Sequence, residues 1–309
     1  MYKIVTHPGS SHKDDFLATC VLLATLGDAD VYRREPTAAD LADLNTFVVD
    51  VGFEYAPERH NFDHHQDRSL PCAFHLVMQH LGHHDAAMQM FAWYRHMSMM
   101  DVSGPYRTAD HLGVDTSVLF AASSPIDGYI LSTFARVAAL GRDDSLYLLM
   151  KALGKDMIDL IDRKTQRLEQ LKAEARVVPV RHLKTVFSEI SDDPKLAMEL
   201  YLRFLDDEQV VMSITPSNRG DGWEYLRLGD NRIVDFRAIA DDPEVHFVHT
   251  SGFLAKTRNR LPMQQAVELA CRAIATEPAE TYAKRSLDMH PRSHLDSRTT
   301  STKVGRQNH

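Results

Sequence analysis

The chain of 309 residues has few cysteines and no long apolar segment. Its 3 cysteines, Cys20, Cys72 and Cys271, form no Cys-x-x-Cys pair, which argues against thiolate zinc sites and disulfide frameworks. No apolar run approaches the ~20 residues that a membrane-spanning helix requires. The first residues also lack the charged and then apolar pattern of a secretion signal. We therefore expect a cytoplasmic protein that does not bind membranes.

Basic residues are fewer than acidic ones, with 35 lysines and arginines against 43 aspartates and glutamates, which gives a formal net charge of −8. A broadly basic surface for nucleic acid is therefore not expected, although bound metal ions would offset some of the carboxylates. At 309 residues, of which 44% are hydrophobic, the chain is long enough to form two well-packed domains.

The first half of the chain alternates predicted strands with predicted helices. Apolar runs predict strands, and apolar residues at helical spacing predict helices. The strands are expected at 2–7, 31–33 and 46–51, and the helices at 14–26, 38–44, 72–81, 86–100 and 126–140. Such an alternation is typical of βαβ units around a parallel sheet.

Residues 143–175 predict one long helix, although Gly154 in its middle leaves two shorter helices open. Beyond it, strands are expected at 177–180, 185–190, 210–214 and 223–228, and helices at 194–205 and 262–275. The expected parts are a catalytic domain at 1–142, a helical connector at 143–176, a substrate-binding domain at 177–283 and a disordered tail at 284–309. The fold class is α/β: an N-terminal parallel sheet with helices on both faces, plus a smaller α+β domain.

Acids and imidazoles follow the first and third predicted strands. His7, His12 and Asp14 come after the first, and Asp50 ends the apolar run 47–49. Because the carboxyl ends of parallel strands meet at one edge of a sheet, these side chains are expected to converge. Carboxylates and imidazoles together bind divalent metal ions. Taken alone, Asp14 or Asp15 is explained equally well as an acid at a helix start. The alternative for Asp50, a cap of the following turn, has less weight, because an unpaired carboxylate after an apolar run would be costly.

The triplet Asp63-His64-His65 is more specific. Adjacent side chains of an extended segment point in opposite directions, so one imidazole would bind metal and the other would face a substrate. Asp63 would then support an imidazole by a hydrogen bond. Asp101, expected at the end of the helix 86–100, is the candidate acid that closes a two-metal site. Its alternative is an ordinary position at a helix end.

The order of these motifs resembles the DHH phosphoesterase superfamily. Within that superfamily it is similar to the MYG exonuclease branch, which has often carried the label metal-dependent protein hydrolase. The resemblance is carried by Thr-His-x-Gly-x-x-His-x-Asp-Asp at 6–15, Val-Val-Asp-Val-Gly at 48–52, Phe-Asp-His-His-Gln at 62–66 and Val-His-Thr-Ser-Gly-Phe at 248–253. The matches therefore extend over both expected domains.

The resemblance implies two Mn²⁺ ions, with Mg²⁺, Co²⁺ and Zn²⁺ as alternatives. One ion would be held by His7, His12 and Asp50. The other would be held by Asp14, Asp50, His64 and Asp101, so that Asp50 bridges the two. His12 replaces an aspartate of many superfamily members, and an imidazole accepts Zn²⁺ or Co²⁺ more readily than a carboxylate does.

The resemblance also implies a metal-dependent hydrolase of phosphoester bonds, most specifically a 3′–5′ exonuclease-type phosphodiesterase. Two ions would activate a hydroxide for attack on phosphorus. Asp50, His64 and His65 are the expected catalytic residues. Substrate contacts are expected from His65, His249, Ser251, Gly252, Lys256 and Arg258. The expected partner is a short nucleic acid or a nucleotide, and assembly into a homo-oligomer is left open.

The sequence departs from the branch on the expected substrate side. Pro71-Cys72-Ala73-Phe74 stands where relatives commonly have Ser-Ser-Ala-Gly, and Leu254-Ala255 replaces a Gly-Gly. Two other hypotheses therefore stay open. One is a small-molecule phosphatase or pyrophosphatase with the same metal site, and the other is a non-catalytic protein that binds metal or nucleotides.

Overall fold

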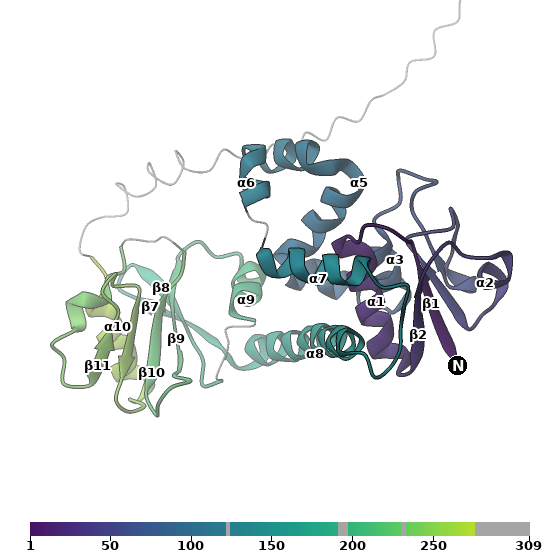
Figure 1. Ribbon diagram of the computed structural model, residues 1–309. Coiled ribbons are helices and arrows are strands. Elements are labelled where there is room, and N and C mark those ends of the chain that lie inside the picture. The colour runs from purple at the N-terminus through teal and green to yellow at the C-terminus, as the bar shows by residue number, and fades with distance from the viewer. Residues whose placement is uncertain (122–123, 191–196, 230–232, 276–309) are drawn as a thin grey trace, which may run out of the picture. The chain divides into compact units, whose positions relative to one another are not determined.

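The computed structural model describes residues 1–121, 124–190, 197–229 and 233–275, and the chain divides into two compact units (Figure 1). Unit 1 comprises residues 1–177 and 186–210, and unit 2 comprises 178–185 and the chain from 211 onward. Each unit contains one six-stranded sheet. The tail at 284–309 lies outside the described residues, and the four-part domain division stays a prediction.

The sheet of unit 1 has the strand order β4-β5-β3-β1-β2-β6. Its strands are β1 (Tyr2–Thr6), β2 (Ala29–Arg33), β3 (Thr46–Val49), β4 (Tyr55–Ala56), β5 (Asn61–Phe62) and β6 (Ala139–Leu140). The four inner strands run parallel, and the edge strands β4 and β6 pair antiparallel to their neighbours. The carboxyl ends of β1, β2, β3 and β5 therefore lie along one edge of the sheet.

The helices of unit 1 follow the predicted order. They are α1 (Lys13–Leu26), α2 (Ala38–Ala42), α3 (Ala73–His80), α4 (His84–Met90), α5 (Ala92–Leu112), α6 (Thr116–Ala121), α7 (Pro125–Ala135), α8 (Ser145–Glu174) and α9 (Met198–Leu205). No helix among the described residues combines the length and apolar character that a membrane crossing requires.

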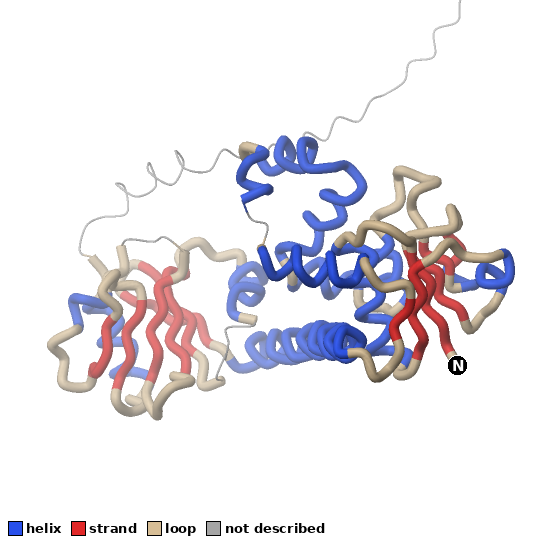
Figure 2. Tube along the Cα trace, viewed as in Figure 1, coloured by secondary structure: helices blue, strands red, loops and turns tan. Residues whose placement is uncertain are grey.

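Helices cover both faces of the sheet in unit 1, which confirms the predicted α/β class. On one face Ile4 and Val49 pack in the main core with α1, α3 and α8 (Figure 2). On the other face Val5 and Val48 pack against Leu41 of the short helix α2. Ile4-Val5 of β1 and Phe47–Val49 of β3 are consecutive apolar residues, because these parts of the strands are buried on both faces of the sheet.

The long helix predicted at 143–175 is confirmed as the single helix α8. Gly154 does not break it. A Cβ atom at position 154 would lie 1.9 Å from the carbonyl oxygen of Cys20, so the glycine lets α8 approach the backbone of α1. The expected connector helix thus packs on α1 and lies in unit 1 (Figure 1).

Two predicted helices are wrong in their bounds. The helix expected at 86–100 is two helices, because Phe91 has extended dihedral angles (φ −116°, ψ 109°) and is buried in the core. The second of them, α5, continues past Asp101 and kinks at Gly104 (φ 78°, ψ 171°), just before Pro105. The helix expected at 126–140 ends at Ala135, because residues 139–140 pair with β2 instead.

The sheet of unit 2 has the strand order β11-β12-β10-β9-β8-β7. Its elements are β7 (Arg176–Val180), β8 (Leu183–Phe187), β9 (Val210–Pro216), β10 (Trp223–Arg227), β11 (Val245–Val248), β12 (Leu254–Thr257) and α10 (Met263–Arg272). The pairs from β9 through β10 and β12 to β11 are antiparallel. The hairpin of β11 and β12 is absent from the sequence-based prediction.

Candidate metal centre

Three strand ends of unit 1 bring the predicted residues together. His7 follows β1, Asp50 follows β3, and Asp63 follows β5. Asp50 has a positive φ (58°), a left-handed conformation that is uncommon for a non-glycine residue and that turns the chain directly after β3. Gly52 (φ 100°) is required in the same turn, since a Cβ there would lie 3.1 Å from Pro36 Cγ.

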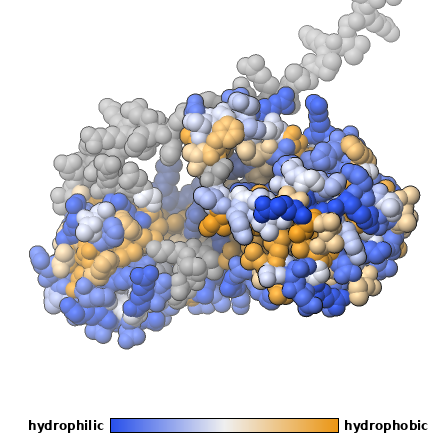
Figure 3. All heavy atoms as spheres, in the orientation of Figure 1, coloured by the Kyte–Doolittle hydropathy of each residue, from blue (hydrophilic) through white to orange (hydrophobic). Residues whose placement is uncertain are grey.

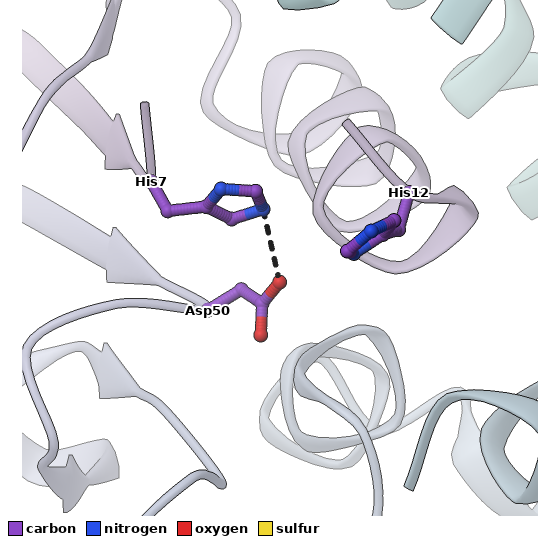
Figure 4. A group of neighbouring side chains, drawn as sticks. All are labelled: His7, His12 and Asp50. Carbon is purple, nitrogen blue, oxygen red and sulfur yellow. Dashed lines mark ion pairs between the residues drawn. The ribbon is translucent and has the colours of Figure 1, made fainter. Parts of the chain in front are cut away.

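The first group of side chains is His7, His12 and Asp50 (Figure 4). His7 and Asp50 point toward each other from neighbouring strand ends, with 3.4 Å between His7 Nε2 and Asp50 Oδ2. His12 lies at the start of α1. One potential ligand atom from each residue lies within 4.8 Å of the others, so the three are able to hold one ion.

The second group surrounds His64. The distances from His64 Nε2 are 3.1 Å to Asp50 Oδ1 and 3.3 Å to Asp101 Oδ2. Asp14 Oδ2 lies 3.8 Å from the same nitrogen. Asp14, His64 and Asp101 satisfy the same 4.8 Å criterion, and Asp50 lies next to both groups. Asp50, His64 and His65 form a third such group. Which of these residues bind which ion stays a prediction.

The extended-chain argument predicted that the two adjacent imidazoles point in opposite directions, and this prediction is wrong. The chain turns here, with the Asp67 N–H donating to the His64 carbonyl at 3.1 Å, and the two rings lie 4.5 Å apart. Asp63 supports His65 rather than His64, through a 2.6 Å hydrogen bond to His65 Nδ1. The Asp63 carboxylate also accepts the N–H groups of His65 and Phe53, at 3.1 and 2.6 Å.

The neighbouring acids Asp14 and Asp15 have different partners. The Asp14 carboxylate accepts the backbone N–H groups of Ala73 and Phe74, at 3.0 and 2.7 Å. These two amides begin α3, and the N-terminus of a helix stabilises negative charge. Asp15 instead accepts the His12 N–H at 2.7 Å, so it caps the start of α1. The helix-start interpretation is thus correct for Asp15 and does not account for Asp14.

Arg33 is a positioning residue that the sequence analysis missed. It is buried, and its guanidinium donates to the carbonyl oxygens of Gly9 and Ser10, each at 3.1 Å. It also donates to Asp15 Oδ2 at 3.3 Å. Arg33 therefore fixes the loop that carries His7 and His12. A signal was present in the sequence, because Arg33 ends the second predicted strand at the same edge of the sheet.

Charge within the centre is unbalanced in favour of the acids. Burial, together with the charge of Asp101, raises the pKa of Asp50 to about 8. Burial and the charges of Asp50 and Asp101 raise the pKa of Asp14 well above its ordinary value. In the described part of the chain, these three acids form ion pairs with histidines and with no lysine or arginine. A buried carboxylate is compensated by a proton, by hydrogen bonds or by a cation, and divalent ions bound by oxygen and imidazole nitrogen fit this donor set.

The predicted substrate residues of unit 2 lie in and beside a tight turn between β11 and β12. The Ser251 N–H donates to His249 Nδ1 at 3.1 Å, and the Gly252 N–H donates to the His249 carbonyl at 2.8 Å. Gly252 (φ 67°) is required here, since a Cβ would lie 2.1 Å from an oxygen of Asp235. Both backbone amides thus stabilise the turn itself.

The two predicted cations of unit 2 have partners of their own. Lys256 Nζ lies 2.8 Å from Glu224 Oε2, and both side chains are largely buried. Arg258 Nε donates to the Pro243 carbonyl at 3.2 Å and is otherwise exposed. A role of either cation in substrate binding stays a prediction.

Comparison with known proteins confirms the resemblance for the start of the chain. Residues 3–76 match the MYG1 exonuclease family model, which is described as an uncharacterised protein family (UPF0160). The MYG1 exonucleases of Rattus norvegicus and Homo sapiens are each 47% identical over 68 residues, which is 21% of this chain. This stretch spans 17% of the length of each curated relative. The family-model match at 3–76 contains every residue of the candidate centre except Asp101.

Solved structures show weaker similarity over more of the chain. RecJ from Thermus thermophilus in complex with Mn²⁺ is 16% identical, covering 92% of this chain and 52% of that chain, with a TM-score of 0.29. An uncharacterized protein from Helicobacter pylori is 11% identical, covering 87% of this chain and 99% of that chain, with a TM-score of 0.26. Similarities this weak identify no activity.

Proposed function

We propose that this chain is a metal-dependent phosphoesterase and, more specifically, a 3′–5′ exonuclease-type phosphodiesterase. The observation that carries the proposal is the position of Asp50. Its two carboxylate oxygens face different imidazoles, Oδ2 toward His7 and Oδ1 toward His64. A carboxylate shared in this way is the bridging ligand that a two-ion site requires.

Each residue has a defined task in this proposal. His7, His12 and Asp50 would hold one Mn²⁺ ion, and Asp14, Asp50, His64 and Asp101 would hold the second. When bound, such ions lower the pKa of water and offset the charge of the phosphate. Asp63 fixes His65 through its Nδ1 atom, which leaves Nε2 to donate to the phosphate or to the leaving oxygen. In hydrolysis the water oxygen forms a bond to phosphorus, the ester P–O bond breaks, and the leaving alcohol takes up a proton.

The proposed substrate is the end of a short nucleic acid. Support comes from the name of the curated relatives, which are exonucleases. The net charge of −8 limits the proposal to a short strand, because an extended duplex requires a broad basic surface. Since Lys256 is paired with Glu224, a small phosphoester or pyrophosphate is the second candidate substrate.

The first test is metal analysis of the full-length protein, purified without chelator and dialysed against Mn²⁺. We expect about two ions per chain, and fewer in the variant His64→Ala. His182→Ala is the matched control, because His182 is exposed and lies in unit 2. A wild-type protein without bound metal would contradict the proposed function.

The second test is turnover with Mn²⁺. Short single-stranded RNA and DNA labelled at either end, nucleoside monophosphates and pyrophosphate are incubated under matched conditions. Shortening from the 3′ end supports the exonuclease assignment. Hydrolysis of the small substrates alone would replace that assignment with a small-molecule phosphatase.

A further inference from the structure

A cavity of about 950 Å³ lies beside the candidate metal centre, within unit 1. Three residues of the centre, His12, Asp14 and Asp101, also line this cavity. Pockets for small molecules measure roughly 300–1,000 Å³, so the volume suits a ligand rather than a packing defect. A molecule held at these three residues would thus extend directly into the cavity.

The walls of the cavity are mainly apolar. They are built by α1, α5, α6, α7 and α8, and their side chains include Phe16, Trp93, Met97, Leu131, Leu153 and Met157. Methionine side chains are flexible and make favourable contacts with aromatic rings, so such walls adapt to apolar ligands of different shape. Apolar residues, drawn in orange, are also visible on the surface of the helical part of unit 1 (Figure 3).

The kink in α5 explains why a cavity forms here. Gly104 takes a backbone that is not helical, and Pro105 has no N–H to donate. The second half of α5 therefore leaves the direction of the first half and forms an arch with α6 (Figure 1). Asp101 precedes the kink and Leu112 follows it, and both line the cavity. The kink thus places one wall of the cavity next to a predicted metal ligand.

One polar group within the lining lacks a partner. His96 lines the cavity, and its Nδ1 atom is buried with no hydrogen-bond partner among the described residues. Ligand pockets commonly combine apolar walls with a few polar groups that orient the ligand. A ligand with a polar atom on an otherwise apolar ring would satisfy His96.

We propose that this cavity binds the apolar substituent of the phosphoester, while the phosphate lies at the metal centre. The substituent is either a planar ring, such as a nucleobase, or an alkyl chain. This inference rests on the proposed function for the position of the phosphate. Burial of the substituent against apolar walls would make substrates with a bulky apolar group bind more tightly than those without one.

The first experiment compares three stable phosphonates by calorimetry with the Mn²⁺-loaded protein. Methylphosphonate has only a small substituent, benzylphosphonate adds an aromatic ring, and octylphosphonate adds an alkyl chain. We expect one or both of the larger ligands to bind at least about tenfold more tightly than methylphosphonate. Preference for benzylphosphonate identifies a base-like occupant, and preference for octylphosphonate identifies an alkyl occupant. Equal affinity for all three overturns the inference.

Matched variants localise the effect to the cavity. Leu153 and Leu149 lie one turn apart on α8, but only Leu153 lines the cavity, and Leu149 is 47% exposed. Leu153→Trp fills the space, so it is expected to remove the preference while methylphosphonate still binds. Leu149→Trp is expected to leave the preference unchanged. Equal effects of the two substitutions overturn the inference, and circular dichroism checks that both variants fold.

Neutral ligands test the cavity without the metal. The metal-free protein is titrated with 2-naphthol and with 1-octanol, and we expect binding of at least one of them that Leu153→Trp abolishes and Leu149→Trp retains. His96→Phe is expected to weaken binding of 2-naphthol and not that of 1-octanol. If neutral ligands bind and no metal does, the proposed function is wrong, but the cavity is still a ligand-binding site. If metal binds and hydrolysis occurs with no neutral ligand bound and no phosphonate preference, the inference fails alone.

Discussion

Buried carboxylates have opposite surroundings in the two units. In unit 2 Glu224 is buried in the sheet, and Lys256 on the neighbouring strand neutralises it at 2.8 Å. In unit 1 Asp50 and Asp14 are buried just as deeply, but their neighbours are acids and imidazoles. The ion pair of Glu224 and Lys256 in unit 2 thus contrasts with an excess of acids at one edge of the sheet in unit 1.

The partners of a buried acid distinguish a structural ion pair from a site that is able to take up an external cation. A buried acid without compensation costs several kcal/mol of folding free energy, so a fold retains it only when something repays that cost. Asp15 shows that unit 1 has the structural solution available, since Arg33 lies 3.3 Å from it. Among the described residues no arginine pairs with Asp14 or Asp50 in this way, and Asp14 is stabilised by the amides of Ala73 and Phe74 instead. The surroundings of Asp50 are therefore able to accept an external cation, as the proposed function requires.

The largest expected effect comes from Asp50→Asn. The variant loses the shared ligand, so we expect at most one bound ion per chain. Activity should fall by roughly a hundredfold to ten-thousandfold, which corresponds to several kcal/mol of lost stabilisation. In the presence of a chelator and above about pH 8, the same variant is expected to melt at a higher temperature than the wild type, because the buried charge of Asp50 has been removed. The measurements are metal analysis, initial rates and thermal melting.

The matching substitution in unit 2 is Glu224→Gln. It leaves Lys256 buried without its partner, so we expect a loss of about 3–5 kcal/mol in the free energy of unfolding. Metal content should stay at the wild-type value. A loss of metal in this variant, or stabilisation by it in chelator, would remove the contrast between the two units.

A smaller effect is expected from Arg33→Lys. Lysine keeps the positive charge near Asp15, but it cannot reach several carbonyl oxygens in a fixed geometry as a guanidinium does. The loop with His7 and His12 should loosen, which weakens one of the two ions by about 10–100-fold, as for other changes behind metal ligands. Calorimetric titration with Mn²⁺ should therefore show one weakened site and one unchanged site. Weakening of both sites to the same extent would mean that Arg33 acts on the whole fold.

The last effect is a gradual dependence of stability on pH. The pKa of Asp50 is raised from its ordinary value of 3.8 to about 8 in the folded metal-free protein. Between these values the folded state binds more protons than the unfolded state, so the free energy of unfolding falls as the pH rises. The contribution is complete below about pH 4 and is lost by about pH 8. Urea denaturation at pH 5 to 8 in chelator should show the decline, and Asp50→Asn should reduce it.

Local patterns in the sequence were sufficient for the strand ends. Ile4-Val5 and Phe47–Val49 are short apolar runs followed by polar residues, so the ends of β1 and β3 and the convergence of His7 and Asp50 follow from the parallel sheet. The same logic applies to Arg33, since it ends β2 at the same edge of the sheet.

Features set by tertiary packing could not be predicted. Phe91 interrupts an apolar pattern that contains no helix breaker, because burying its ring in the core outweighs the continuity of the helix. The ring positions of His64 and His65 depend on a turn whose hydrogen bond closes only in the folded chain. Gly104-Pro105 was a visible signal of the kink, but the cavity beside it requires five helices to be placed around it.

The close approach at Gly154 makes the centre sensitive to a residue that never touches it. Since α8 lies against the main chain of α1 at Cys20, the distance between the two helices is set there, and Asp14 lies in the first turn of α1. An added methyl group at position 154 would force the two helices apart, and we expect the Asp14 carboxylate to shift relative to His64. A mutational survey confined to the residues around the centre would overlook the effect of Gly154 on the position of Asp14.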